Sequence, residues 1–215
     1  KNIQENFLPN TEKEFFVFTD GELEGTPDNV TVVQQKHLDW PYVTLLRFEI
    51  INKAKKELSG FSRVIFMDAD TLVVDTVTEE EFLSDKPLFG VHHPCHFLGM
   101  QPHDTHPGAF ETNPKSKAGI LDSDDVSVYF QGCLWGGQVP YVLDMVDELK
   151  SRTQKDLDDD IIAQWHDESQ MNKFFAERRE DVHVLQPEYP EVFKQSCNFE
   201  PKIVHLAKDN SEYQV

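Results

Sequence analysis

The stretch that most constrains the fold runs from Arg63 to Val74 and joins an apolar segment to two acidic residues. Val64 to Met67 are consecutive apolar residues that include β-branched and aromatic types, which is typical of a strand buried on both faces in a parallel sheet. Asp68 and Asp70 follow where this run stops. Residues two apart in extended backbone share a face, and ligands of open α/β sheets bind beyond the carboxyl ends of the strands. We therefore expect Asp68 and Asp70 to bind Mn²⁺, with Mg²⁺ as the alternative, together with a phosphate.

The spacing of these two acids is not specific by itself. The chain contains 39 Asp and Glu residues, and segments 122–124 and 158–160 repeat the pattern. Asp68 and Asp70 differ from those repeats because an apolar strand leads into them. The alternative interpretation of the pair is a solvated strand end.

Length and charge narrow the class of protein. A chain of 215 residues predicts a single domain, residues 1–215, with a sizeable core. The net charge of −19 argues against nucleic acid or an anionic membrane as partner, but allows a polyanionic small ligand whose charge a metal offsets. No membrane-spanning apolar run and no signal-peptide pattern are visible, which predicts a cytoplasmic location. Three widely spaced cysteines, Cys95, Cys133 and Cys197, are expected to be reduced thiols.

The order of predicted elements is that of an α/β protein. Besides the strand at 64–67, strands are expected at 14–20, 30–33, 88–93, 126–135, 182–185 and 203–206, and helices at 41–59, 138–151 and 156–178. Gly136 and Gly137 are expected to end the fourth of those strands. Residues 98–125 are polar and lack periodicity, which predicts a functional or mobile loop. We expect a mixed, mostly parallel sheet flanked by helices.

A second polar group lies in the segment WHDESQMNKFF at 165–175, where five side chains able to bind a ligand fall within nine residues. On a helix, Asp167 and Lys173 lie on different faces, so the segment is not only a ladder of ion pairs. The alternative is a solvated amphipathic helix with Trp165, Met171 and Phe174 facing inward.

This segment resembles the H-D-E-S-x-x-N-K-[YF] motif of the family 6 glycosyltransferases, which include the blood-group A and B transferases and the α-1,3-galactosyltransferase. Other motifs of that family follow in the same order along the chain. They are F-T-D at 18–20, W-P-x-x-T-L-x-R-F at 40–48, D-A-D at 68–70, G-x-x-H-P at 90–94, Y-F-x-x-x-x-W-G-G at 129–137 and V-L-x-P-E-Y at 184–189. The resemblance extends over about positions 14 to 190.

The resemblance implies a GT-A nucleotide-sugar fold that transfers a hexose from a UDP-sugar to the hydroxyl of a glycan or other acceptor. The anomeric configuration is retained, which gives an α-linkage. A divalent ion neutralises the diphosphate of the leaving UDP, and Glu168 supplies negative charge near the anomeric carbon of an oxocarbenium-like transition state. Two alternatives stay open: Glu168 attacks covalently, or it orients the acceptor hydroxyl while the leaving phosphate takes the proton.

The resemblance also assigns roles to individual residues. The residues that it implies for donor binding are Arg47, Asp68, Asp70, Gln131, Cys133, Asp167 and Lys208. His93 and Trp165 are implied as acceptor contacts, for which the alternatives are a strand-end histidine and a core aromatic. Relatives with glycine at the position of Cys133 tend to take N-acetylgalactosamine, and those with alanine take galactose. Because cysteine is larger than both, we expect UDP-galactose, with UDP-glucose as the alternative, over N-acetylated donors.

The chain departs from the family pattern in three places. The family's first strand carries part of the uracil pocket and has no counterpart before Lys1, so we expect that strand to be missing. Lys208 aligns with a lysine of the family's basic tail, but Gln214 stands where an arginine is expected. Residues 98–125 lack the family's Y-E-R-R segment, so acceptor contacts in that loop are not transferred.

Other classes remain as alternatives. Segments 63–74 and 202–207 are also similar to the family 8 glycosyltransferases related to glycogenin, in which a late histidine, here His205, is the third metal ligand. That alternative does not explain segment 166–174. A non-catalytic acidic module that binds sugar or Ca²⁺ is a second alternative. A pseudoenzyme is a third alternative. The presence of acidic residues at 68, 70, 167 and 168 together argues against it.

Overall fold

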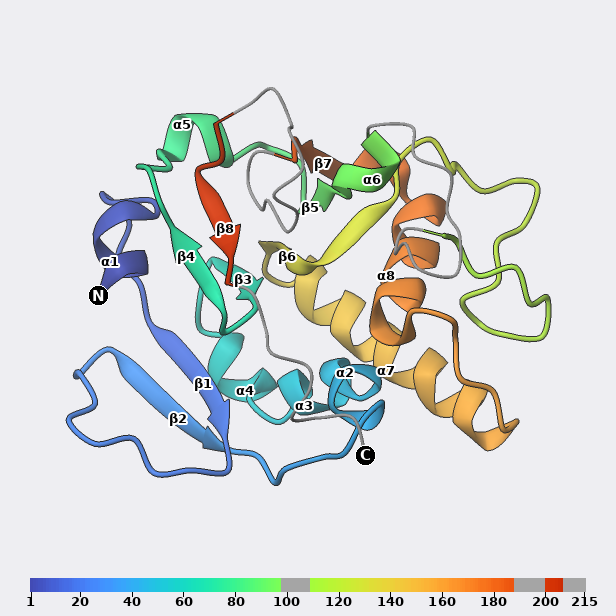
Figure 1. The fold of residues 1–215 in the computed structure, drawn as a ribbon, viewed down its shortest axis with the longest axis horizontal. Coiled ribbons are helices and arrows are strands. Elements are labelled where there is room, and N and C mark those ends of the chain that lie inside the picture. The colour runs from blue at the N-terminus through green and yellow to red at the C-terminus, as the bar shows by residue number, and fades with distance from the viewer. Residues whose placement is uncertain (98–108, 188–199, 207–215) are drawn as a thin grey trace.

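The computed structural model describes residues 1–97, 109–187 and 200–206, without the side chain of Cys95 (Figure 1). Its strands are β1 (Phe15–Thr19), β2 (Val30–Gln34), β3 (Arg63–Met67), β4 (Thr71–Val73), β5 (Leu88–His92), β6 (Phe130–Gln138), β7 (Val182–Leu185) and β8 (Ile203–His205). Its helices are α1 (Asn2–Asn6), α2 (Tyr42–Leu45), α3 (Arg47–Asn52), α4 (Lys55–Leu58), α5 (Glu79–Phe82), α6 (Pro94–Phe97), α7 (Tyr141–Asp158), α8 (His166–Glu177) and the short 3-10 helix η1 (Arg179–Asp181). Of these helices, none is both long and apolar enough to span a bilayer.

The central sheet has four strands in the order β3-β6-β5-β7. β6 runs antiparallel to β3 and to β5, while β5 and β7 are parallel, so β3, β5 and β7 share one direction. Two further pairs stand apart from it, β1 with β2 in parallel and β4 with β8 in antiparallel orientation. The predicted α/β class is confirmed: the sheet is mixed, three of its four strands run the same way, and helices flank it (Figure 1).

The position of β3 differs from the prediction of a strand buried in a parallel sheet. Among the described residues, β3 pairs only with β6, which is antiparallel, and lies at the edge of the central sheet. Its five residues are all partly exposed. The run is apolar because alternate side chains meet different cores: Val64 and Phe66 pack on one hydrophobic cluster, and Ile65 and Met67 on another.

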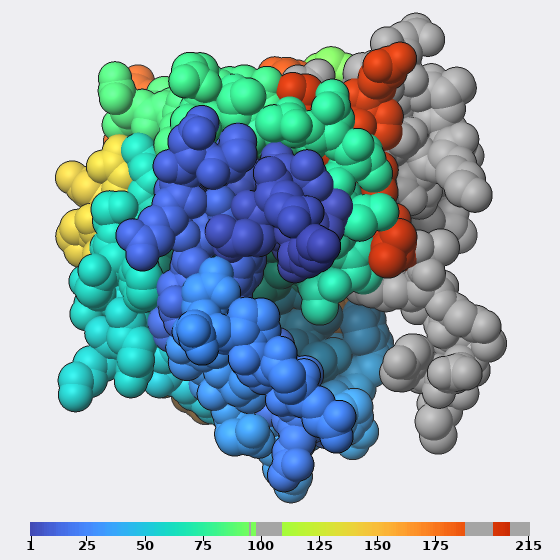
Figure 2. All heavy atoms as spheres, turned by 90° about the vertical axis from the view of Figure 1, so that its left-hand side faces the viewer, coloured from blue at the N-terminus to red at the C-terminus, as the bar shows by residue number. Residues whose placement is uncertain are grey.

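These two clusters lie on opposite faces of the central sheet. The larger one joins the sheet to α3, α7 and α8, and includes Phe48, Met145 and Phe174. The smaller one joins the sheet to α1, β4, α5 and β8, and includes Phe7 and Ile203. Figure 2 shows the side of the molecule that carries α1. The residues of α1 lie at the front of this view, and β4 and β8 lie next to each other at one edge of it.

The helix predicted over 41–59 is divided into α2, α3 and α4. The backbone leaves helical angles at Leu46 and Ala54. Apolar residues three apart shift by about 60° around a regular helix with each step, so a continuous helix would turn part of its apolar stripe towards solvent. The two breaks keep Leu45, Phe48 and Leu58 buried.

Two other predicted boundaries are wrong for identifiable reasons. β6 continues through Gly136 and Gly137 because these glycines allow neighbouring backbones to approach: an added Cβ would lie 2.3 Å from the carbonyl oxygen of Val64 or of Pro87. α7 extends to Asp158, and the left-handed backbone of Asp160 (φ 57°) separates it from α8.

Part of the long loop predicted at 98–125 lies outside the described residues, which resume at residue 109. The described part is held against α7 and α8 by buried acidic side chains. Glu111 accepts the backbone N–H of Gln164 at 2.7 Å, and Asp156 accepts the hydroxyl of Ser116 at 2.7 Å. Lys173 forms a buried ion pair with Asp124 at 2.6 Å. These contacts therefore fix residues 109–125 against α7 and α8.

Candidate functional site

A bulge in β6 creates the centre of the site. Gly90 of β5 pairs with Trp135, but the next residue, Val91, pairs with Gln131. Residues 132–134 therefore lack a partner in β5, both strands being fully described. The released peptide groups of Gly132 turn to other elements: its N–H donates to Glu168 Oε2 at 2.7 Å, and its carbonyl accepts from Arg47 Nη1 at 2.8 Å. Bulges commonly redirect groups in this way beside active sites.

Glu168 lies in the first turn of α8 and receives a hydrogen bond on each carboxylate oxygen. The hydroxyl of Tyr129 donates to Oε1 at 2.9 Å, and Gly132 donates to Oε2. Burial raises the pKa of Glu168 to about 7, while these two hydrogen bonds act to lower it. A carboxyl group that titrates near neutral pH inside a structured site is a candidate for catalysis.

Arg47 connects the two acidic parts of the site. Its Nη1 lies 2.9 Å from Asp167 Oδ2, and its Nη2 lies 3.6 Å from Asp68 Oδ1. Its guanidinium also lies over the ring of Phe66, 4.7 Å from the centroid. Burial raises the pKa of Asp167 to about 6, and the positive charge of Arg47 opposes that rise. The guanidinium thus joins α8 to the end of β3.

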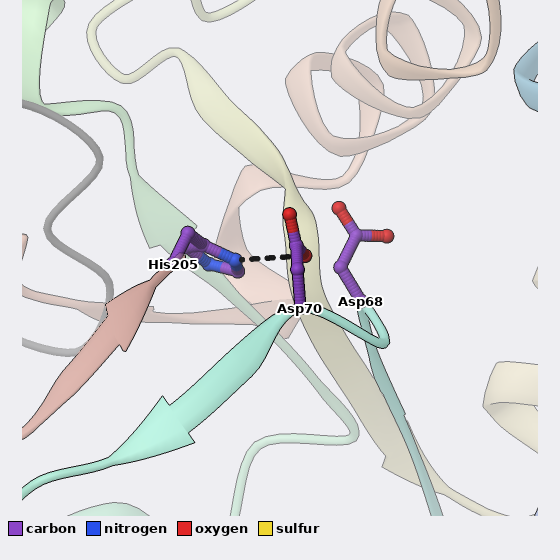
Figure 3. A group of neighbouring side chains, drawn as sticks. All are labelled: Asp68, Asp70 and His205. Atoms are coloured by element: carbon purple, nitrogen blue, oxygen red, sulfur yellow. Dashed lines mark ion pairs between the residues drawn. The ribbon is translucent and has the colours of Figure 1, made fainter. Parts of the chain in front are cut away.

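Asp68, Asp70 and His205 form the candidate metal centre. One ligand atom from each lies within 4.8 Å of the others. Figure 3 shows the two carboxylates directed to the same side of the chain, with the imidazole of His205 facing Asp70. The local conformation differs from the extended backbone that we expected, because residues 69 and 70 form a turn closed by a hydrogen bond from Thr71 to the carbonyl of Asp68.

The pairing of β4 with β8 brings His205 to this turn, since Thr71 is its partner in the register. His205 Nδ1 lies 3.5 Å from Asp70 Oδ1. Its Nε2 is buried and has no hydrogen-bond partner among the described residues. Two carboxylates and an imidazole form a donor set that Mn²⁺ accepts, and the buried nitrogen without a partner is consistent with a ligand atom. The residues therefore fit a divalent ion.

The residues expected to contact the acceptor are His93 and Trp165. His93 is buried after β5, and its backbone N–H donates to the carbonyl of Tyr129 at 2.7 Å. Burial lowers the pKa of His93 to about 4, and the charges of the nearby His96 and His92 contribute to this to a smaller extent. The imidazole of His93 is therefore neutral. Trp165 immediately precedes α8, and its indole N–H is buried without a hydrogen-bond partner in the described part of the chain.

Gln131 and Cys133 flank Gly132 in the bulge, and both are buried. Gln131 Oε1 has no hydrogen-bond partner within the described ranges. Cys133 is a free thiol whose pKa is raised by burial and then by the negative charges of Asp68 and Glu168. It therefore stays protonated. Lys208 lies outside the described residues.

Comparison with known proteins decides the family. The model of glycosyltransferase family 6 matches residues 12–215. The chain belongs to glycosyltransferase family 6. It is 28% identical over 176 residues to the O-antigen biosynthesis glycosyltransferase WbnI of Escherichia coli, covering 81% of this chain and 73% of the relative.

Two mammalian proteins are also similar to this family 6 chain. The histo-blood group ABO system transferase 1 of Rattus norvegicus is 28% identical over 204 residues, with 88% of this chain and 54% of the relative covered. The human globoside alpha-1,3-N-acetylgalactosaminyltransferase 1 is 26% identical over 198 residues, again with 88% and 54% covered. The chain thus spans about half the length of these mammalian relatives.

The family match confirms the resemblance seen in the sequence and removes family 8 as the classification. The histidine that the family 8 alternative singled out is nevertheless next to the two aspartates. The family 6 motif at 166–174 divides into two groups. Asp167 and Glu168 face the site, whereas Asn172 and Lys173 are buried in contacts that hold β6 and the 109–125 segment. α8 is therefore not the solvated helix of the alternative interpretation.

Sequence reasoning gave no role to Tyr129 or Gly132, although both contact Glu168 directly. The signal for Gly132 was a glycine inside an apolar strand, which often marks a bulge or a close approach of another group. An added Cβ at Gly132 would lie 3.1 Å from Glu168 Oε2. Tyr129 begins the family motif at 129–137, but that motif did not indicate a contact with Glu168, because the hydroxyl reaches a residue 39 positions away.

Proposed function

We propose that this family 6 chain transfers galactose from UDP-galactose to the hydroxyl of a glycan or other acceptor, with retention of configuration and an α-linkage as the product. The observation that supports this best is the placement of Glu168. Two donors hold its carboxylate, and consecutive residues of β6 connect it to the candidate metal centre: Gly132 bonds Glu168, and the carbonyl of Cys133 accepts the N–H of Asp68 at 3.0 Å.

The donor side of the proposal uses both acidic groups. Asp68, Asp70 and His205 would hold Mn²⁺, or Mg²⁺ in its place, and the bound ion supplies positive charge that offsets the diphosphate of the departing UDP. Asp167 accepts from hydroxyls of the sugar, while Arg47 keeps Asp167 ionised and in place. Lys208 is proposed to contact the diphosphate.

The reaction breaks the bond between the anomeric carbon and a phosphate oxygen, and the electron pair leaves with UDP. A new bond forms between that carbon and the acceptor oxygen. In one route, the charge of the Glu168 carboxylate stabilises the positive anomeric carbon while the departing phosphate takes the acceptor's proton. In the other, Glu168 bonds to the carbon as UDP leaves, and the acceptor then displaces the carboxylate and gives its proton to the phosphate of the bound UDP. Both routes require Glu168 to be ionised.

The acceptor side consists of His93 and Trp165. A neutral imidazole both accepts and donates a hydrogen bond, which suits the hydroxyl groups of a sugar. The buried indole N–H of Trp165 has no partner among the described residues, and a bound acceptor oxygen would satisfy it. These two contacts support the choice of a hydroxyl-bearing acceptor.

A panel of UDP-sugars tests the proposal. UDP release is measured for UDP-galactose, UDP-glucose and their N-acetylated counterparts, with Mn²⁺ and with EDTA. We expect release from UDP-galactose with Mn²⁺ and its loss in EDTA. The Glu168→Gln variant should lose release, while Glu180→Gln, at an exposed glutamate of η1, should match the parent. Binding of the panel without any UDP release would instead support the non-catalytic sugar-binding module.

A further inference from the structure

We propose that Tyr129 is a positioning residue for this reaction, whose hydroxyl holds the Glu168 carboxylate in place and in its ionised form. The inference rests on the proposed function, because it concerns the same carboxylate. It assigns the hydroxyl a part in the reaction that differs from filling the core.

The geometry of the carboxylate carries the inference. The Tyr129 hydroxyl donates to Oε1 at 2.9 Å, and the Gly132 N–H donates to Oε2 at 2.7 Å. Tyr129 immediately precedes β6 and Gly132 lies in its bulge, so the two donors are three positions apart in the chain. Because each oxygen has its own donor, the rotation of the carboxylate about its last bond is fixed. An ionised carboxylate accepts both bonds, whereas a protonated one would direct a hydrogen towards one of the donors.

The ring of Tyr129 is itself held on several sides. It is fully buried, and the ring of Phe110 meets it edge-on with centroids 5.0 Å apart. The imidazoles of His93 and His96 lie 5.8 and 6.4 Å from it, centroid to centroid. The backbone carbonyl of Tyr129 accepts a hydrogen bond from the backbone N–H of His93. These contacts hold the hydroxyl at Glu168.

The surrounding charges explain why the carboxylate needs this donor. Burial acts to protonate Glu168, and the negative charge of Asp167 on α8 acts in the same direction. Arg47 on α3 opposes them. On β6, Cys133 is protonated, as described above. Burial and the charge of Glu168 hold the pKa of Tyr129 well above its usual range, so its phenol stays a donor. The neutral His93 and the nearby carboxylate of Glu111 complete the groups around the phenol.

The Tyr129→Phe variant removes the hydroxyl and keeps the ring. Hydrolysis of UDP-galactose is measured against pH with saturating Mn²⁺. Without the donor, the pKa of Glu168 should rise by about one unit, since a hydrogen bond to a charged group contributes on the order of one pKa unit. The acid limb of the kcat profile should shift upward by about one pH unit. The loss should be about 5-fold at pH 7, approach about 10-fold below pH 6, and largely recover at pH 9, with KM for UDP-galactose nearly unchanged.

A matched control is Tyr141→Phe, at an exposed tyrosine that begins α7, whose profile should superimpose on that of the parent. A loss of rate in Tyr129→Phe that is equal at every pH would overturn the inference, because a structural role predicts that result. If the parent itself does not hydrolyse UDP-galactose or any other UDP-sugar, the proposed function fails instead.

A second measurement does not depend on activity. The carboxyl carbons of glutamate are labelled with carbon-13, and the Glu168 signal is assigned by its absence in Glu168→Gln. NMR titration then gives the pKa of Glu168 in the parent and in Tyr129→Phe. We expect the value in the variant to be higher by about one unit, whereas equal values in two folded proteins would show that the hydroxyl does not hold the ionised form.

Discussion

The side-chain amide of Asn172 forms hydrogen bonds with both backbone groups of Phe130. Its Oδ1 accepts the N–H at 2.6 Å, and its Nδ2 donates to the carbonyl at 2.8 Å. β3 pairs with β6 only as far as Leu134, so it does not reach Phe130. The amide of Asn172 makes the hydrogen bonds that a neighbouring strand would make there. Its Nδ2 also donates to the carbonyl of Glu168 at 2.9 Å. One buried amide therefore fixes the start of β6 to the turn of α8 that carries the proposed catalytic residue.

We predict that Asn172→Ala destabilises the fold by about 2–4 kcal/mol, because it leaves the buried N–H and carbonyl of Phe130 without partners. Urea unfolding at neutral pH measures the change. Asn10→Ala provides the matched control: this exposed amide makes one long side-chain contact of 3.4 Å, to Glu79, and its loss should cost less than about 0.5 kcal/mol. Equal stability of the two variants would contradict the role of Asn172.

Local pattern was sufficient to predict the strands other than β4 and the start of β6, whereas most of the polar residues of the site were named from the family resemblance. β7 was predicted with its observed bounds, and β1, β2, β5 and β8 to within one or two residues. These segments are short apolar runs whose ends are marked by polar or turn residues, so their signal is contained in a few neighbouring positions. The same holds for Asp68 and Asp70, which an apolar strand introduces.

Pairing between distant segments was not predictable in this way. The reversed direction of β6, the edge position of β3 and the bulge at Gly132 depend on which strands meet, and no local pattern encodes that choice. The hydrogen bond from Gly132 to Glu168 lies in this bulge, and the one from Tyr129 joins residues 39 positions apart, so both were missed. His205 was named from a family resemblance, but only the pairing of β4 with β8 shows how it reaches the aspartates.

The charge of Glu168 should dominate its contribution to catalysis. Glu168→Gln keeps the size of the side chain but cannot place negative charge at the anomeric carbon, and should lower turnover of UDP-galactose by about 10²- to 10⁴-fold. Affinity for the donor, measured by calorimetry, should change little because Arg47 and Asp167 remain. A variant that keeps near-normal turnover would remove Glu168 from the mechanism.

The same substitution should alter the pH dependence of stability. Burial raises the pKa of Glu168 to about 7, above that of a glutamate in the unfolded chain. A raised carboxyl pKa stabilises the folded state at low pH, and this stability is lost as pH rises through the folded-state value. Between pH 5 and pH 8, the unfolding free energy of the parent should therefore fall relative to that of Glu168→Gln by about 2 kcal/mol. Urea unfolding of both proteins at several pH values tests this, and parallel curves would show that the pKa of Glu168 is not raised.

His205 is expected to be the third ligand of the ion held by Asp68 and Asp70. His205→Ala should lower the affinity for Mn²⁺ by about 10-fold or more, measured by calorimetry in the absence of any sugar. At saturating Mn²⁺, affinity for UDP-galactose should stay near that of the parent. His37→Ala removes a histidine whose side chain is 68% exposed and should leave the Mn²⁺ titration unchanged. If the His205→Ala titration also superimposes on the parent, His205 only fills the end of β8.

The last prediction concerns the choice of donor sugar. Cys133 is buried in the bulge beside Gly132, and its thiol lies close enough to Asp68 and Glu168 for their charges to act on its pKa. A side chain there should exclude an N-acetyl group at C2 of the donor, so the parent should turn over UDP-galactose faster than UDP-N-acetylgalactosamine. Cys133→Gly opens this space and should shift the ratio of kcat/KM towards the N-acetylated donor by about 10- to 100-fold, the range expected for small groups in a pocket. Cys133→Ala, which keeps a Cβ, should retain the preference for galactose. If the glycine variant keeps the parent's ratio, Cys133 does not line the pocket, and a parent that prefers the N-acetylated donor would refute the assignment of galactose itself.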